Sequence, residues 1–85
     1  MMEIVHREVA PGTVVVTLTG KLMLGPEGDQ ILALVEQLLA EGARKIIFDL
    51  SGVTLIDSTG IGRFIASFNK IMAAGGEMRM AGATD

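Results

Sequence analysis

The chain has 85 residues, no cysteine, one histidine and a formal net charge of −3. At this length it forms one domain at most, so we expect residues 1–85 to fold as a single domain. The lack of cysteine excludes a disulfide framework, a thiolate metal site and a cysteine nucleophile, and one histidine excludes a histidine-rich metal site. Packing of helices on a sheet must therefore stabilise the fold, unless a partner helps.

The composition is apolar for so small a chain, with 49% hydrophobic residues and a mean hydropathy of +0.51. No run approaches the roughly 18 apolar residues of a membrane span, and Met1–Ile4 lacks the basic region that opens a signal peptide. A pI near 5.0, with no basic cluster larger than Arg44-Lys45, argues against direct nucleic-acid binding. We therefore expect a cytoplasmic protein with no membrane span.

The first part of the chain alternates in hydrophobicity and predicts two strands, at residues 3–9 and 13–19. Ala10-Pro11-Gly12 between them is a turn signal. Because the connection is so short, we expect an antiparallel hairpin.

Residues 20–25 are expected to form a loop, although its centre is unusually apolar. Pro26 then suits the first turn of a helix, and apolar residues recur at helical spacing from Ile31 to Leu39. Gly42 provides the stop signal for this helix.

The second half of the chain predicts a strand, a helix and a last strand. Residues 44–50 form a continuous apolar run typical of a central strand, after which Ser51-Gly52 is expected to turn the chain before the short apolar segment 53–56. A helix follows, and a last strand covers residues 77–81. One face of that helix carries Ile61, Phe64, Ile65, Phe68 and Met72. The resulting order, β-β-α-β-α-β, predicts an α/β fold with crossovers and a mixed sheet.

Residues suited to catalysis are scarce. His6 is the only histidine and is expected to be an ordinary surface residue, while Asp49 and Asp57 are weak candidates for an acid–base pair. Gly60-Ile61-Gly62 is only half of a dinucleotide-binding loop, and Gly20-Lys21 is followed by Leu rather than Ser or Thr, which excludes a Walker A motif. An enzyme is therefore the least expected class, and no cofactor is expected.

Ser58, at the start of the second helix, has two interpretations. It is an N-cap, whose hydroxyl accepts a backbone N–H and stabilises the helix by about 1 kcal/mol. Alternatively it is a regulatory phosphorylation site, since a helix N-terminus tolerates a phosphate. Gly60 and Gly62 remove side chains from the first turn, so that another protein can approach the backbone. A phosphate on an apolar contact surface would disrupt such docking.

Two stretches, Ile46–Val53 (IIFDLSGV) and Ile56–Gly62 (IDSTGIG), closely resemble the central signature of STAS domains, the anti-sigma factor antagonists (anti-anti-sigma factors) of bacteria. The order of elements fits the same family, as does Gly20-Lys21-Leu22 before the first helix. The resemblance runs from about residue 3 to residue 84 and is most specific in Asp-Ser-Thr-Gly-Ile-Gly, at the strand-to-helix junction. It implies the STAS-like mixed sheet with helices.

The resemblance also implies a partner switch. In such proteins the serine that matches Ser58 is phosphorylated by an anti-sigma factor that is also a serine kinase, and the kinase, not this chain, binds ATP. The unphosphorylated form binds the kinase and releases the sigma factor, the phosphorylated form lets go, and a phosphatase resets it. By this resemblance Asp57 would shape the loop and position the hydroxyl. The docking surface would consist of Thr59, Gly60 and Gly62, together with Lys21, Leu22, Met23 and Leu24.

The chain departs from the family pattern in two places. Met23 stands where the family often has an acidic or polar residue, so the usual kinase contacts are in doubt; we expect Met23 to be an exposed, adaptable contact. Family members usually continue past the strand that matches Met78–Ala81 into another helix, which this sequence lacks. The face that this helix would cover is then bare, and we expect a homodimer or higher oligomer, with or without exchanged elements.

Two other functions remain open. The apolar Leu22-Met23-Leu24 segment also fits an accessory subunit of a bacterial transport system, such as a lipid transporter. A small-ligand sensor, with a nucleotide or lipid near Gly20 and Ser58, is a further alternative. The choice between Ser58 and Thr59 as phosphoacceptor stays open as well, although the N-terminal position favours Ser58.

Overall fold

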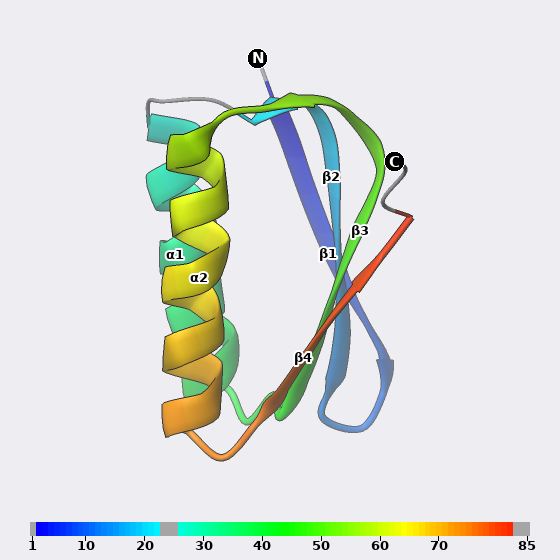
Figure 1. Ribbon diagram of the computed structural model, residues 1–85. Coiled ribbons are helices and arrows are strands. Elements are labelled where there is room, and N and C mark those ends of the chain that lie inside the picture. The colour runs from blue at the N-terminus through cyan, green and yellow to red at the C-terminus, as the bar shows by residue number, and fades with distance from the viewer. Residues whose placement is uncertain (1, 23–25, 83–85) are drawn as a thin grey trace.

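The computed structural model describes residues 2–22 and 26–82 and shows two helices lying side by side on one face of a sheet (Figure 1). The β-β-α-β-α-β order expected from the sequence is confirmed. The elements are β1 (Met2–Ala10), β2 (Thr13–Leu22), α1 (Pro26–Ala40), β3 (Lys45–Ile56), α2 (Ser58–Ala73) and β4 (Glu77–Ala81).

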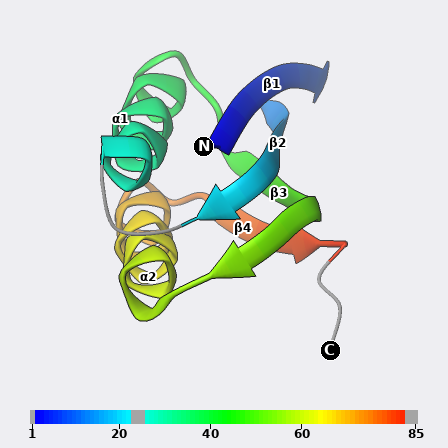
Figure 2. The same cartoon turned by 90° about the horizontal axis from the view of Figure 1, so that it is seen from above.

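The sheet has the strand order β1-β2-β3-β4 and is mixed, as predicted. β1 and β2 pair antiparallel through their short turn, whereas β2–β3 and β3–β4 are parallel. Both crossovers carry the chain one strand onward in the same direction. Because such crossovers are right-handed, α1 and α2 must lie on the same face of the sheet, which Figure 2 shows from above.

The core lies between this face of the sheet and the two helices. Alternate residues of β2 and β3 point into it, and Phe48 of β3 meets Phe64 of α2 edge to face, with 5.2 Å between the ring centroids. Its buried apolar side chains are Val14, Val16, Leu18, Ile31, Val35, Leu38, Ala43, Ile46, Phe48, Phe64 and Ile71. The stripe predicted for α1 is thus the one that the sheet covers.

β1 is longer than predicted by one residue at each end, and β2 and β3 are extended further, both for the same reason. β2 continues through residues 20–22, which were expected to lie in a loop, and β3 does not turn at Ser51-Gly52 but runs on to Ile56. The two extensions pair with each other, since Gly20 lies opposite Val53 and Leu22 opposite Ile56. Ladder hydrogen bonds therefore outweigh the local loop preferences.

Ser51-Gly52 forms an irregularity within β3 instead of a turn, where the register with β2 shifts between Thr17 and Thr19. The Asp49 carboxylate accepts hydrogen bonds from the Ser51 N–H at 3.0 Å and from its hydroxyl at 2.8 Å, which satisfies the polar groups of the bulge. A Cβ on Gly52 would lie 3.1 Å from Thr19 Oγ1, so a larger residue would crowd β2.

The apolar face predicted for α2 is divided in the structure. Phe64 is buried as part of the core, but the other four members are exposed: Ile61, Ile65, Phe68 and Met72. Positions 60, 64, 67 and 71 face the core instead, and Ser67 is tolerated there because its hydroxyl donates to the Arg63 carbonyl at 2.9 Å. The stripe that meets the sheet is therefore rotated from the one that hydrophobicity alone predicted.

Candidate functional site

The junction between β3 and α2 carries the Asp-Ser-Thr-Gly motif. Asp57 is the N-cap of α2: its backbone is extended (φ −104°, ψ −179°), and its Oδ1 accepts the Gly60 N–H at 2.9 Å. Its carbonyl also accepts the Ile61 N–H at 3.1 Å, which begins the helical pattern. Ser58 is the first helical residue, so the interpretation of Ser58 as the N-cap is wrong.

The side chains that follow the cap differ in exposure. Ser58 is exposed, Thr59 is half-buried, and Gly60 is buried beneath the first turn. No acidic residue lies in this turn, and the Asp57 carboxylate caps the N-terminal end of the helix, which carries a partial positive charge. A phosphate on Ser58 would therefore lie in solvent, at the end of the helix that favours a negative charge.

The end of β2 lies beside this junction, as the resemblance implied. Lys21 pairs with Leu55 and Leu22 with Ile56, immediately before Asp57. Thr54 Oγ1 donates to the Gly20 carbonyl at 3.3 Å, and Gly20 has φ 106°, a conformation that favours glycine.

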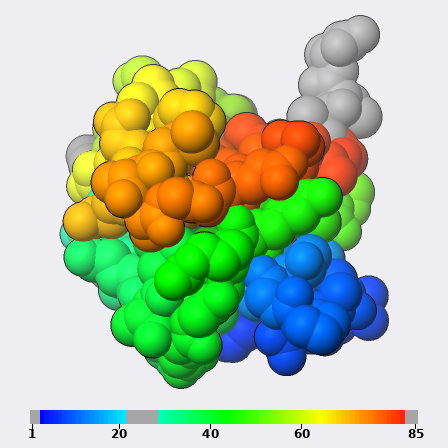
Figure 3. All heavy atoms as spheres, turned by 90° about the horizontal axis from the view of Figure 1, so that it is seen from below, coloured from blue at the N-terminus to red at the C-terminus, as the bar shows by residue number. Residues whose placement is uncertain are grey.

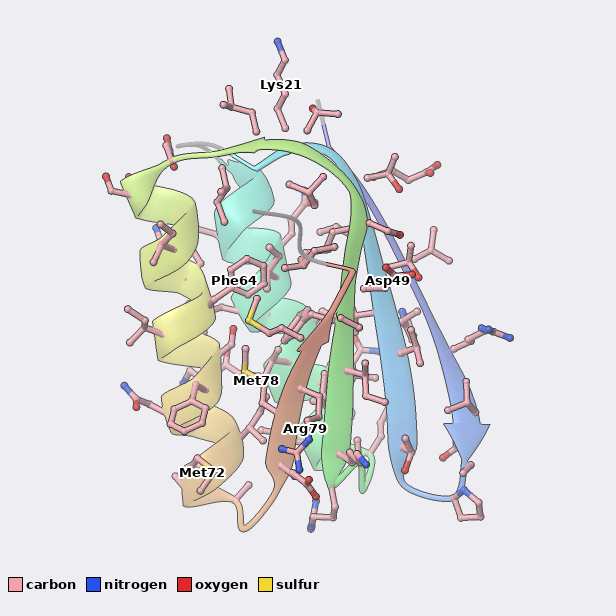
Figure 4. The ribbon with its side chains drawn as sticks, turned by 45° about the vertical axis from the view of Figure 1, so that its right-hand side comes forward. Lys21, Asp49, Phe64, Met72, Met78 and Arg79 are labelled. Carbon is pink, nitrogen blue, oxygen red and sulfur yellow. The ribbon has the colours of Figure 1, made fainter. Side chains whose placement is uncertain are left out.

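Figure 4 shows the Lys21 side chain extending away from the sheet at the end where β3 crosses to α2. The structure thus brings Lys21 and Leu22 to the Asp-Ser-Thr-Gly motif, while Met23 and Leu24 lie outside the described residues.

The two glycines of the motif have different structural roles. Gly60 is buried and donates its N–H to the Asp57 cap. Gly62 is exposed, and a Cβ built on it meets nothing within 4 Å. Packing among the described residues therefore does not require a glycine at position 62.

Arg63, which sequence reasoning did not single out, ties the start of α2 to α1. Its guanidinium contacts the Asp29 carboxylate at 2.9 Å, and one turn from the other end of α2 Lys70 contacts Glu36 at 3.1 Å. The two cations of α2 are thus directed towards α1. From the sequence, these ion pairs could be inferred only indirectly. The four charged residues lie on the polar sides of α1 and α2, and the two crossovers place both helices on the same face of the sheet.

An apolar groove of about 360 Å³ runs along the other side of α2, between this helix and β4. Figure 3 shows the C-terminal part of α2 beside β4 at the surface, and in Figure 4 Phe64 and Met78 point towards the space between them. The groove begins at Ile56, next to the cap, and its lining is wholly apolar. It is lined by Ile56, Ile61, Phe64, Ile65, Phe68, Met78 and Met80.

Asp49 and Asp57 do not form a catalytic pair. Asp49 lies in the middle of β3, where the backbone N–H and then the hydroxyl of Ser51 hold the pKa of its carboxyl below the ordinary value. Asp57 lies eight positions further along the chain, beyond the end of β3 at the start of α2. His6 is an exposed residue of the edge strand β1.

Within residues 2–22 and 26–82 no group of three or more histidine or acidic side chains is placed to hold a metal ion. No helix in this part of the chain is long and apolar enough to cross a membrane.

Comparison with protein families gives one clear result. The family model described as STAS domain matches residues 5–85, nearly the whole chain. A search of the curated proteins finds no match.

Solved structures show the same architecture. The anti-sigma factor antagonist SpoIIAA in its unphosphorylated form superposes with a TM-score of 0.83 at 24% identity, covering 98% of this chain and 76% of that one. The phosphorylated form of the Bacillus cell fate determinant SpoIIAA gives a TM-score of 0.75 at 26% identity, over 89% of this chain and 68% of that one.

A murine anion transporter, solute carrier 26 family member A9, contains a similar region. It has a TM-score of 0.61 at 18% identity and covers 84% of this chain but only 12% of that one. This fold is therefore found both in small antagonists and within a much larger transport protein.

Proposed function

The chain belongs to the STAS domain family, and from that premise we propose that it is an anti-sigma factor antagonist switched by a phosphate on Ser58. STAS domains of the SpoIIAA type are binding modules rather than enzymes in general. The unphosphorylated chain binds an anti-sigma factor that is also a serine kinase, which frees a sigma factor. The phosphorylated chain dissociates, and a phosphatase restores it. The proposal places this single domain in the cytoplasm and gives it no cofactor of its own.

The observation that carries the proposal is the exposed hydroxyl at the first position of α2. Asp57 supplies the cap, and among the described residues no hydrogen bond occupies the Ser58 hydroxyl. The Ser58 oxygen can therefore attack the γ-phosphorus of ATP bound to the kinase, while its proton passes to a base of the kinase and ADP leaves. The product keeps the cap, so a phosphate need not unfold the helix.

The surroundings of Ser58 explain why a phosphate would release a partner. Two apolar side chains flank the motif: Ile56 is 38% exposed and Ile61 is 50% exposed. Gly62 has no side chain, so the backbone of the first turns of α2 is accessible beside them. A partner that covers these groups would also remove Ser58 from water. A phosphate with a charge of about −1.5 to −2 would then lose its hydration in an apolar contact, which opposes docking.

The test is phosphorylation by the cognate kinase with labelled ATP, comparing wild type, Ser58→Ala and Thr59→Ala. We expect Ser58→Ala to lose the label and Thr59→Ala to keep it. Equal labelling of Ser58→Ala and wild type would reject Ser58 as the acceptor. In a pull-down with the same kinase, the phosphorylated chain should be lost from the complex while Ser58→Ala is retained.

A second candidate function is an accessory subunit of a bacterial transport system, such as a lipid transporter. The observation that favours it is the similarity to a region of the murine anion transporter. In that case the chain would co-purify with a transport ATPase, and transport would be indifferent to Ser58→Ala. If Ser58 is the phosphoacceptor, Ser58→Ala instead abolishes the activity of the chain as a switch.

A further inference from the structure

The strand β1 forms one edge of the sheet (Figure 2). In the part of the chain that the structure describes, β1 pairs with β2 on one side and with no strand on the other. Half of the backbone N–H and C=O groups of an edge strand point to its outer side, where another strand can pair with them. β1 has nine residues, whereas β4 at the opposite edge has five, so β1 is the longer free edge.

β1 is regular only from Met2 to Glu8. Its register with β2 shifts between Glu8 and Ala10, and such an irregularity bends and twists a strand. The regular part is centred on Val5. A second copy of β1 that runs antiparallel can therefore use the whole regular part in one register alone, in which Val5 lies opposite Val5.

The charges of β1 are arranged symmetrically about the same residue. Its even-numbered residues lie opposite core residues of β2, so Glu3, Val5 and Arg7 project from the face of the sheet that carries no helix. Glu3 and Arg7 are exposed, and neither has an ion-pair partner among the described residues. On β4, by contrast, Arg79 pairs with Glu77. β1 thus presents an unpaired anion and an unpaired cation, one on each side of an apolar residue.

We propose that the outer edge of β1 pairs antiparallel with β1 of a second copy of this chain, around a two-fold axis at Val5. In this register Glu3 of each chain lies opposite Arg7 of the other, so two ion pairs flank the central pair of valines. On the helix side, residues 6 and 8 lie opposite residues 4 and 2, so no like charges meet. The two sheets become one, with the helices of both chains on the same face.

The order of the charges selects both the partner and the register. Centring the pair on Ile4 or His6 leaves Glu3 and Arg7 opposite apolar residues, and centring it on Arg7 brings two arginines together. An unrelated edge strand would have to carry the same charges in reverse order, whereas a copy of β1 does so by symmetry. The inference is independent of the proposed function, because β2 lies between β1 and the strand that leads to Ser58.

Sedimentation velocity from about 10 μM to about 1 mM tests the dimer, because a contact through one edge strand is smaller than a standard interface and therefore weak. We expect wild type to dimerise within this range. Arg7→Glu and Glu3→Arg should each weaken the dimer by about tenfold or more, since both ion pairs become pairs of like charge. An equimolar mixture of the two variants should restore it, because each chain then carries the charges that the other lacks.

The control for Arg7→Glu is Lys21→Glu, which makes the same change in net charge at an exposed residue of β2. This control should dimerise as wild type does.

Cysteine, which the chain lacks, tests the register. A short thiol cross-linker should join two copies of Val5→Cys but not two copies of Val9→Cys. In the proposed register the two residues at position 9 lie more than about 20 Å apart, because they are at opposite ends of the paired strands. Val5 and Val9 are 54% and 47% exposed, so the cross-linker reaches both positions.

Each of four results would overturn the proposal. These are a wild type that stays monomeric throughout the range, single reversals that dimerise as wild type does, a mixture that stays monomeric, and equal cross-linking of the two cysteine variants. A Lys21→Glu variant as weak as Arg7→Glu would also do so, because net charge alone would then explain the loss. If a reversed variant does not fold, as circular dichroism would show, the two cysteine variants decide.

One further variant separates this dimer from the phosphorylation switch. Ser58→Ala should dimerise as wild type does. A kinase that fails to label Ser58 would refute the proposed function and leave the dimer untouched.

Discussion

The two helices have nearly the same length and lie on the same face of the sheet, yet they use their apolar residues differently. In α1, Ile31, Val35 and Leu38 form one stripe, and the sheet covers it. In α2 the sheet covers Phe64 and Ile71, while a second apolar stripe stays exposed, namely Ile61, Ile65, Phe68 and Met72. α1 is thus complete within the chain, whereas α2 has the composition of a helix packed on two sides.

The difference explains the unusual composition of the chain. A small domain gains stability from each apolar residue that it buries, so a chain of 49% hydrophobic residues would be expected to have a large core. Much of the apolar surface of α2 adds nothing to that core. It is exposed in the single chain, at Ile61, Ile65, Phe68 and Met72.

The largest expected effect contrasts a covered residue with an exposed one. Ile31→Ala should lower the free energy of unfolding by about 3 kcal/mol, because Ile31 is 1% exposed and its removal leaves a cavity. Ile65→Ala should lower it by less than about 1 kcal/mol, since Ile65 is 59% exposed. Urea unfolding at low protein concentration, where association does not contribute, measures both.

Equal losses in the two variants would break the comparison between the helices. They would show that the sheet already shields Ile65 as it shields Ile31. A loss in Ile65→Ala that appears only at high protein concentration would sharpen it, because association then accounts for the difference.

The next effect concerns two adjacent polar residues at the start of α2. Asp57→Ala should cost about 1 kcal/mol of stability, because the Gly60 N–H loses the carboxylate that caps the helix. Ser58→Ala should change stability by less than about 0.5 kcal/mol, since Ser58 is exposed. Thermal unfolding of both variants decides the matter, and a larger cost for Ser58→Ala would return the role of cap to Ser58.

Hydrophobic periodicity predicted the order of elements, because strands and helices of this chain differ clearly in their spacing of apolar residues. β4 was predicted with its observed bounds, and the α1 stripe is the buried one. The extensions of β2 and β3 could not be predicted, since each is stabilised only by pairing with the other. The buried position of Ser67 was also missed, because its hydroxyl is satisfied by the helix backbone.

The Asp-Ser-Thr-Gly motif of the candidate site was visible in the sequence, but the separate roles of its residues were not. Asp57 and Ser58 are both good N-cap residues, and only the backbone geometry assigns the cap to Asp57. The resemblance placed Lys21 and Leu22 near Ser58, and the pairing of β2 with β3 explains why they lie there. The apolar groove could not be predicted from the sequence, because its lining residues come from three different elements, β3, α2 and β4.

A smaller effect, of opposite sign, is expected at Gly62. Gly62→Ala should raise the stability of the chain by about 0.5 to 1 kcal/mol, because alanine favours the helix and its Cβ meets nothing within 4 Å. The same variant should bind the anti-sigma factor kinase more weakly, since the new methyl group stands on the proposed docking surface. Calorimetric binding alongside thermal unfolding separates the two. Unchanged binding would remove Gly62 from that surface.

The smallest effect tests whether charge or packing holds α2 against α1. Lys70 and Glu36 are separated by 3.1 Å, but their side chains are 44% and 59% exposed, so water and salt screen their attraction. Lys70→Met should therefore cost about 0.5 kcal/mol or less, and that cost should shrink in high salt. A double-mutant cycle with Glu36→Gln isolates the pair. A coupling energy well above 1 kcal/mol would mean that ion pairs fix the position of α2. A smaller one leaves that role to Phe64 and Ile71, which α2 packs into the core.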